Sequence, residues 1–125
     1  MIAKMLWLGA AGAAGTLARY SLAGLVQQMG DGSLPWGTFA VNVVGCLVAG
    51  LFWAIAEDRT AISGETRAIV LVGFMGAFTT FSAFMAETGE LLQDAEWTWA
   101  LGNLTLQNVL GVGMFLVGLS VGRLV

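Results

Sequence analysis

The sequence predicts an all-α membrane protein with four transmembrane helices, the third of which is broken near the middle of the membrane. Hydrophobic residues make up 58% of the chain and charged residues only 10%, whereas a typical soluble domain has about 25% charged residues. Four long apolar segments alternate with short polar connections. None of these segments has the period-two alternation of a β-barrel strand, and helices satisfy their own backbone hydrogen bonds in lipid.

The whole chain, residues 1–125, is expected to form a single transmembrane domain. A span requires about 20 mostly apolar residues, and the ranges that meet this requirement are about 5–28, 34–56, 68–86 and 97–122. The connections, which carry polar or turn-forming residues, are Met29–Ser33, Glu57–Arg67 and Glu87–Glu96. One lysine precedes the first apolar segment, but no small-residue cleavage site precedes a mature soluble domain, so we expect this segment to be a retained span and not a cleaved signal peptide.

The composition argues against several classes of function. The net charge is −3 and the basic residues do not cluster, so a nucleic acid is not an expected partner. The chain has no histidine and one cysteine, Cys46, which excludes a disulfide framework or a Cys/His metal site within one chain. No nucleophile–base pair is visible, and we therefore do not expect an enzyme.

The first span combines small residues with one charge. Glycine and alanine fill Gly9–Gly15, and small residues at helical spacing allow two helices to approach closely. Arg19 lies within the span, where a charge is expensive and marks a functional or interhelical role. Two interpretations stay open: Arg19 is a structural anchor that reaches the membrane surface, or it makes a vestibule for an anion positive.

The second span begins at Pro35, which suits the first turn of a helix. Thr38 and Asn42 are four residues apart and share one helix face. Gly45 and Cys46 extend this face with small side chains. A buried amide needs partners, so Asn42 either links helices or faces a wet cavity, and the residues alone favour the link.

The third span contains residues that weaken a helix. Gly73, Gly76, Thr79 and Thr80 lie close together, and both glycine and threonine disfavour a continuous helix interior. Backbone that is not helical at this depth is tolerated only where it is buried in protein or lines a cavity. A broken helix exposes carbonyl groups that can hold a cation and N–H groups that attract an anion.

Two phenylalanines and a serine follow these residues. Phe81 and Phe84 project to one side of the helix, and Ser82 projects elsewhere. The edges of aromatic rings carry a partial positive charge, so such rings could contact an anion. Phenylalanines at this spacing are more often packing residues, and both interpretations stay open.

The fourth span is mostly apolar, but its first part carries Asn103, Thr105, Gln107 and Asn108.

Three motifs, in order, resemble those of the Fluc/CrcB family of fluoride channels, and the resemblance covers the whole chain. They are GTLARY at Gly15–Tyr20, GTFAVNVVG at Gly37–Gly45 and GFMGAFTTFSAF at Gly73–Phe84. The third motif is the most specific. The resemblance implies passive export of fluoride from the cytoplasm across the bacterial inner membrane, which lowers fluoride toxicity. It also implies a dual-topology homodimer of two antiparallel subunits in the bilayer, with two pores at their interface.

The resemblance implies roles for particular residues. A structural sodium ion at the centre of the dimer would be held by the backbone carbonyls of Gly76 and Thr79. The fluoride pore would be formed by Thr38, Asn42, Phe81, Ser82 and Phe84. Arg19 would lie at a vestibule and Glu87 near a pore mouth. Ala83 replaces a threonine of the family pattern, and Val112, Met114 and Phe115 occupy a region of the fourth helix where the family often has hydroxyls. Thr105 or Asn108 would then supply the polar contact from this helix.

Two alternatives and one conflict remain at this point. A proton-coupled small multidrug exporter also has four short spans, but it needs a buried carboxylate, and the charge in the first span is Arg19. A non-transporting assembly subunit would suit the many small-residue seams.

With four spans, Lys4, Arg59, Arg67 and Arg123 fall on one side of the membrane. The positive-inside rule then predicts insertion mainly with the N-terminus inside, in contrast to dual topology.

Overall fold

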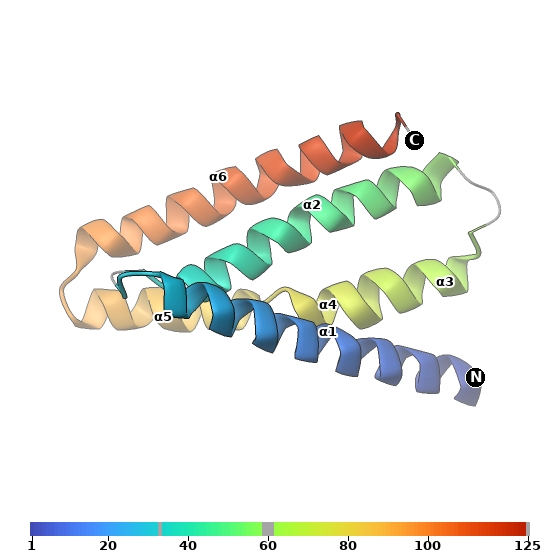
Figure 1. Cartoon of the computed structure of the whole chain (residues 1–125), viewed down its shortest axis with the longest axis horizontal. Coiled ribbons are helices and arrows are strands. Elements are labelled where there is room, and N and C mark those ends of the chain that lie inside the picture. The colour runs from blue at the N-terminus through green and yellow to red at the C-terminus, as the bar shows by residue number, and fades with distance from the viewer. Residues whose placement is uncertain (33, 59–61, 125) are drawn as a thin grey trace.

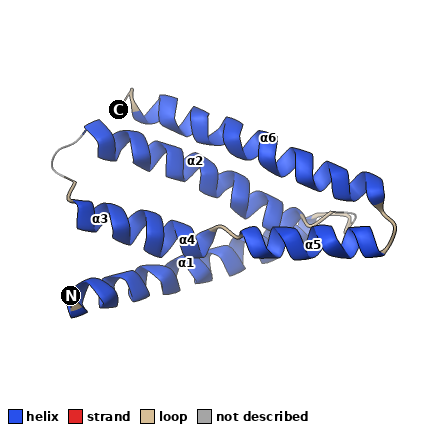
Figure 2. Ribbon diagram, turned by 180° about the vertical axis from the view of Figure 1, so that it is seen from behind, coloured by secondary structure: helices blue, strands red, loops and turns tan. Residues whose placement is uncertain are grey.

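The computed structural model describes residues 1–32, 34–58 and 62–124, and it is helical with no strand over this part of the chain (Figures 1 and 2). The elements in order are α1 (Ile2–Met29), α2 (Trp36–Asp58), α3 (Gly64–Ala68), the π-helix η1 (Ile69–Met75), α4 (Gly76–Phe78), α5 (Phe81–Gln93) and α6 (Trp97–Gly122). The all-α prediction is therefore confirmed for the described residues. Ser33 and Arg59, which the sequence placed in connections, lie outside them.

In the described part of the chain, three helical units are long and apolar enough to cross a membrane: Trp36–Glu57, Gly64–Gln93 and Trp97–Gly122. The first helix, α1, has 28 residues and is about 42 Å long at 1.5 Å per residue, which is sufficient length for a span. Its hydropathy is lower because it contains Arg19 and is rich in glycine and alanine. The second, third and fourth expected spans thus have the length and composition of a membrane helix. The first expected span, in α1, stays a prediction.

The helices run along one long axis, as Figure 1 shows. The start of α1, the end of α2, the start of α3 and the end of α6 lie at the same end of the molecule. Lys4, Arg67 and Arg123 are therefore at this end. The helix α2 packs along α6, whereas α1 packs on η1 and α4, and α5 packs on α6.

Glycine allows the backbones of these pairs to approach closely. A Cβ atom at Gly118 of α6 would overlap the backbone carbonyl of Leu47 in α2, and one at Gly15 of α1 would overlap the carbonyl of Phe74 in η1. The close packing predicted for Gly9–Gly15 is thus confirmed at Gly15. Any side chain at either glycine would push the paired helices apart.

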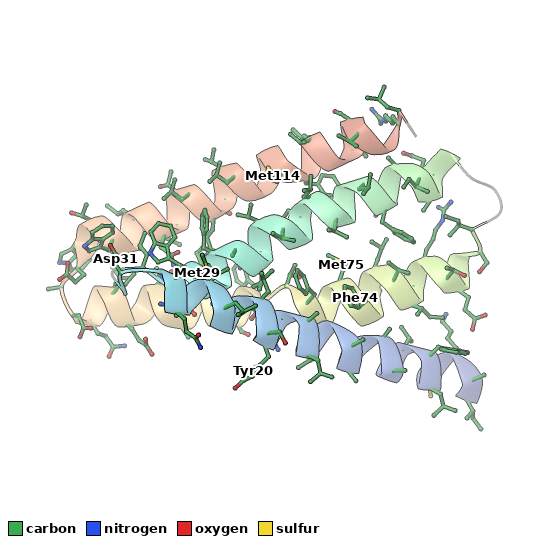
Figure 3. The ribbon with its side chains drawn as sticks, viewed as in Figure 1. Tyr20, Met29, Asp31, Phe74, Met75 and Met114 are labelled. Atoms are coloured by element: carbon green, nitrogen blue, oxygen red, sulfur yellow. The ribbon has the colours of Figure 1, made fainter. Side chains whose placement is uncertain are left out.

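The core inside one chain is small. Val41, Met75 and Phe78 form its buried centre, against which neighbouring apolar side chains pack. Figure 3 shows Phe74 and Met75 on the third helical unit, with α1 on one side and α2 on the other. Large apolar side chains such as Leu6 and Val72 are exposed, as expected for a surface in which lipid replaces water.

The predicted break in the third span is confirmed. Helix α4 ends at Phe78, Thr79 and Thr80 are extended with φ/ψ of −83°/158° and −147°/113°, and α5 begins at Phe81. Figure 2 shows this interruption between α4 and α5. The π-helical turn of η1 was not predicted. Helix α5 also continues to Gln93, through residues that the sequence assigned to a connection.

Candidate functional site at the helix break

The side chain of Asn42 holds the break in place. Its Oδ1 accepts a hydrogen bond from the backbone N–H of Thr80 at 2.8 Å, and its Nδ2 donates to the carbonyl of the same residue at 3.1 Å. The same Nδ2 donates to Oε1 of Gln107 on α6 at 2.7 Å. Asn42 therefore joins α2, the break and α6, and the interhelical link that the sequence favoured is confirmed.

The hydrogen bonds at the break leave two backbone carbonyl groups without their usual helical donors. In a continuous helix, the carbonyl of Gly76 would accept from the N–H of Thr80, and that of Thr79 from the N–H of Ala83. Here the Thr80 N–H donates to Asn42 instead, and the Ala83 N–H donates to the Thr80 side-chain oxygen at 3.2 Å. The two carbonyls expected to hold a cation thus both lose their usual helical donor. Carbonyl oxygens of this kind are ligands that hard cations take.

A groove of about 480 Å³ runs along one side of the break, and we call it the Phe81 groove. Of the residues predicted for the site, it gathers Asn42, Gly76, Thr79, Phe81, Phe84 and Asn108. Gln107 lines it as well. Amide groups, backbone at the break and aromatic rings therefore face one open space, although they come from three different parts of the sequence.

The two rings of this groove differ in burial. Phe84 is only 4% exposed, whereas Phe81 is 72% exposed. Their centroids are 5.8 Å apart and their planes meet at 77°, so that one ring presents its edge to the other. The Phe81 ring projects outward from the chain. It is available to a molecule or subunit that covers the groove.

A second groove, of about 920 Å³, brings Arg19, Thr38 and Glu87 together, and we call it the Arg19 groove. The hydroxyl of Thr38 donates to Oε1 of Glu87 at 2.5 Å. The other carboxylate oxygen of Glu87 is buried without a hydrogen-bond partner among the described residues. Tyr20 also lines this groove, and its side chain points away from the other helices (Figure 3). Thr80 lines both grooves, so the break lies between them.

Two predicted residues lie apart from both grooves. Ser82 and Thr105 are exposed and line neither groove. The hydroxyl oxygen of Ser82 lies 3.5 Å from the hydroxyl oxygen of Thr80. Asn108 does line the Phe81 groove, but its amide donates to the carbonyl of Leu104 in its own helix at 2.7 Å.

Three buried polar residues at or behind the groove are not among the predicted site residues. Thr88, Asn103 and Gln107 are buried, with exposures of 4%, 2% and 6%. Gln107 Nε2 donates to Asn103 Oδ1 at 3.0 Å, and Asn103 Nδ2 donates to the Thr88 hydroxyl at 2.9 Å. The four-residue spacing of Asn103 and Gln107 puts both on one face of α6, and this signal could have identified them.

The chain is similar in sequence to bacterial proteins of known name. Each of the following relatives is named fluoride-specific ion channel FluC. The relative from Desulforapulum autotrophicum is 55% identical over 122 residues, which is 98% of each chain. The relative from Nitrosococcus oceani is 49% identical with the same coverage. The relative from Solidesulfovibrio magneticus is 47% identical over 125 residues, the full length of both chains.

The match to a family extends over almost the whole chain. Residues 6–119 match the family described as CrcB-like protein, Camphor Resistance (CrcB). This range contains the second and third apolar segments, nearly all of the first and fourth, the break and both grooves. The chain therefore belongs to the CrcB family.

Proposed function

We propose that the protein is a fluoride channel that passively exports fluoride from the cytoplasm and so lowers fluoride toxicity. The main structural support for this proposal is the Phe81 groove, which the Asn42 amide and two phenylalanines line beside a helix break. The names of its relatives agree with this function. The channel is expected to be a multi-pass protein of the bacterial inner membrane.

The groove offers an anion neutral donors instead of charged ones. Fluoride that enters it takes the place of one acceptor of the Asn42 amide, either the Gln107 side chain or the Thr80 carbonyl. The edges of the Phe81 and Phe84 rings add a weak positive potential. No lysine or arginine is among the described residues that line this groove. Binding is therefore shallow enough for the ion to leave, as conduction requires.

Two copies of the chain, inserted antiparallel, would complete the pores. The exposed Phe81 ring and the open side of its groove would face the second copy, giving two pores along the interface. The Arg19 groove would serve as a vestibule, where the positive charge of Arg19 attracts the anion and Glu87 lies near the pore mouth. Thr38, Ser82, Thr105 and Asn108 would contribute polar contacts along the path.

The same arrangement suits a central sodium ion. One chain offers the carbonyls of Gly76 and Thr79, and a second copy would double this set to four oxygens, which suits a hard cation. A bound sodium ion supplies a fixed positive charge that offsets the cost of an anion in a medium of low dielectric. Asn42 and the Thr80 hydroxyl contribute by capturing the N–H groups that would otherwise occupy these carbonyls.

Efflux from proteoliposomes tests the function. Purified protein is reconstituted with fluoride inside, and release is followed with a fluoride electrode in the absence of a proton gradient, with chloride-loaded vesicles as the control. A channel releases fluoride and retains chloride. Efflux only when a proton gradient is imposed would favour a proton-coupled exporter, and absence of efflux would favour an assembly subunit.

A further inference from the structure

The amide side chains along and behind the Phe81 groove form one continuous chain of hydrogen bonds. It starts at the break, where Thr80 N–H donates to Asn42, and it passes to Gln107 at 2.7 Å and then to Asn103 at 3.0 Å. From Asn103 it reaches the Thr88 hydroxyl at 2.9 Å, which donates to the carbonyl of Phe84 at 2.7 Å. We call this series the amide chain.

Both ends of the amide chain are backbone groups whose roles cannot be exchanged. The N–H of Thr80 can only donate, and the carbonyl of Phe84 can only accept. Each amide between them must therefore turn its oxygen toward the Thr80 end and its nitrogen toward the Phe84 end. If one amide were flipped, two acceptors or two donors would face each other in a buried environment.

We propose that Asn103 and Gln107 are positioning residues that hold the Asn42 amide and the first turn of α5 in a single orientation. Thr80 and Phe84, the two ends of the amide chain, flank this turn, so the side chains of α2 and α6 hold the turn at both of its ends. The inference rests on the proposed function, because the groups held in place are those proposed to meet fluoride. It assigns to α6 a positioning role in place of the missing hydroxyl contacts.

Hydrogen exchange at the Thr80 amide tests this role without relying on transport. In the native protein this N–H is bonded to Asn42. Gln107→Leu removes the acceptor that holds Asn42, and we expect the Thr80 N–H to exchange roughly tenfold faster, as for the loss of about one net hydrogen bond. Gln93→Leu, the same change at the exposed end of α5, should leave the exchange unaltered.

A second variant acts at the far end of the amide chain with little change in volume. Thr88→Val removes the hydroxyl that joins Asn103 to Phe84, and it should also accelerate exchange at Thr80. Ser120→Ala is its control, because the Ser120 hydroxyl donates to the carbonyl four residues earlier on an exposed face. The effects of Gln107→Leu and Thr88→Val should not add in the double variant, because both interrupt one series of bonds.

The outcomes separate this inference from the proposed function. Accelerated exchange in Thr88→Val and non-additivity support the positioning role, and fluoride efflux should fall in the same variants. Unchanged exchange at Thr80 in the folded Thr88→Val variant overturns the role, as does full additivity. If the unmodified protein passes no fluoride, the proposed function fails, whereas the exchange measurements still decide whether the amide chain orients Asn42.

Discussion

At the scale of the residue, the amide of Asn42 stabilises the helix break because it forms the hydrogen bonds that a backbone peptide group would form. It accepts from the N–H and donates to the carbonyl of Thr80, and thereby replaces partners that a continuous helix would supply. A carboxamide is the side-chain group that matches a peptide in this way, since it has both a donor and an acceptor. The one residue that stabilises the break therefore also lines the Phe81 groove.

We predict that Asn42→Asp lowers fluoride efflux at least tenfold while the protein still assembles. The carboxylate can still accept from Thr80, but it cannot donate to Gln107 or to fluoride, and its negative charge repels the anion. Efflux from proteoliposomes and size-exclusion chromatography measure the two effects. Gln93→Glu, the same kind of change at an exposed position, is the control. Equal efflux from both variants would remove Asn42 from the ion path.

The sequence indicates some of these residues but not others. Asn42 could be identified because an amide inside an apolar span requires partners. On α6, the polar residues at positions 103, 105, 107 and 108 do not all lie on one face of the helix. Which of them faces inward depends on the rotation of α6 against α2, and this rotation is set by the close approach at Gly118. The spacing of the polar residues alone therefore does not distinguish the buried Gln107 from the exposed Thr105 and Asn108.

At the scale of the element, the break and the α2–α6 pair depend on each other. The Asn42 side chain can reach both Thr80 and Gln107 only because α2 lies against α6 along its length. The local sequence predicts the break because Gly76, Thr79 and Thr80 weaken the helix there. It does not predict the π-helical turn of η1, which no residue pattern in Ile69–Met75 specifies.

We predict that Gly118→Ala destabilises the protein by about 1–3 kcal/mol, since the added methyl group overlaps the Leu47 carbonyl and separates α2 from α6. Gly113→Ala is the matched control on the same helix, because its Cβ would meet no atom within 4 Å. Alanine favours a helix over glycine by about 1 kcal/mol, so the control should be neutral or stabilising. Thermal unfolding in detergent compares the variants, and equal melting temperatures would contradict a tight α2–α6 seam.

At the scale of the whole molecule, one end carries Lys4, Arg67 and Arg123 and the proposed assembly requires two orientations. The basic end consists of the start of α1, the start of the third helical unit and the end of α6 (Figure 1). The positive-inside rule favours this end in the cytoplasm. The proposed antiparallel dimer needs about equal numbers of both orientations, so the two expectations differ in a way that can be measured.

We predict that a cysteine placed at Glu96, in the connection between α5 and α6, is accessible from both sides of the membrane. Glu96→Cys is introduced with Cys46→Ala and labelled with a membrane-impermeant maleimide in intact cells and in inverted vesicles. The antiparallel dimer predicts labelling of about half of the protein from each side. Labelling from one side only would show that the basic end determines a single orientation, and it would contradict the antiparallel assembly.

The most direct test of the central claim, that fluoride crosses the membrane along the Phe81 groove, is fluoride efflux from proteoliposomes containing Phe81→Ile. This change removes the exposed aromatic ring while keeping an apolar side chain at the same place. Trp7→Ile, at an exposed aromatic residue of α1 outside both grooves, is the control. We expect Phe81→Ile to lose most fluoride efflux and the control to retain it. Undiminished efflux from assembled Phe81→Ile protein would contradict a path along this groove.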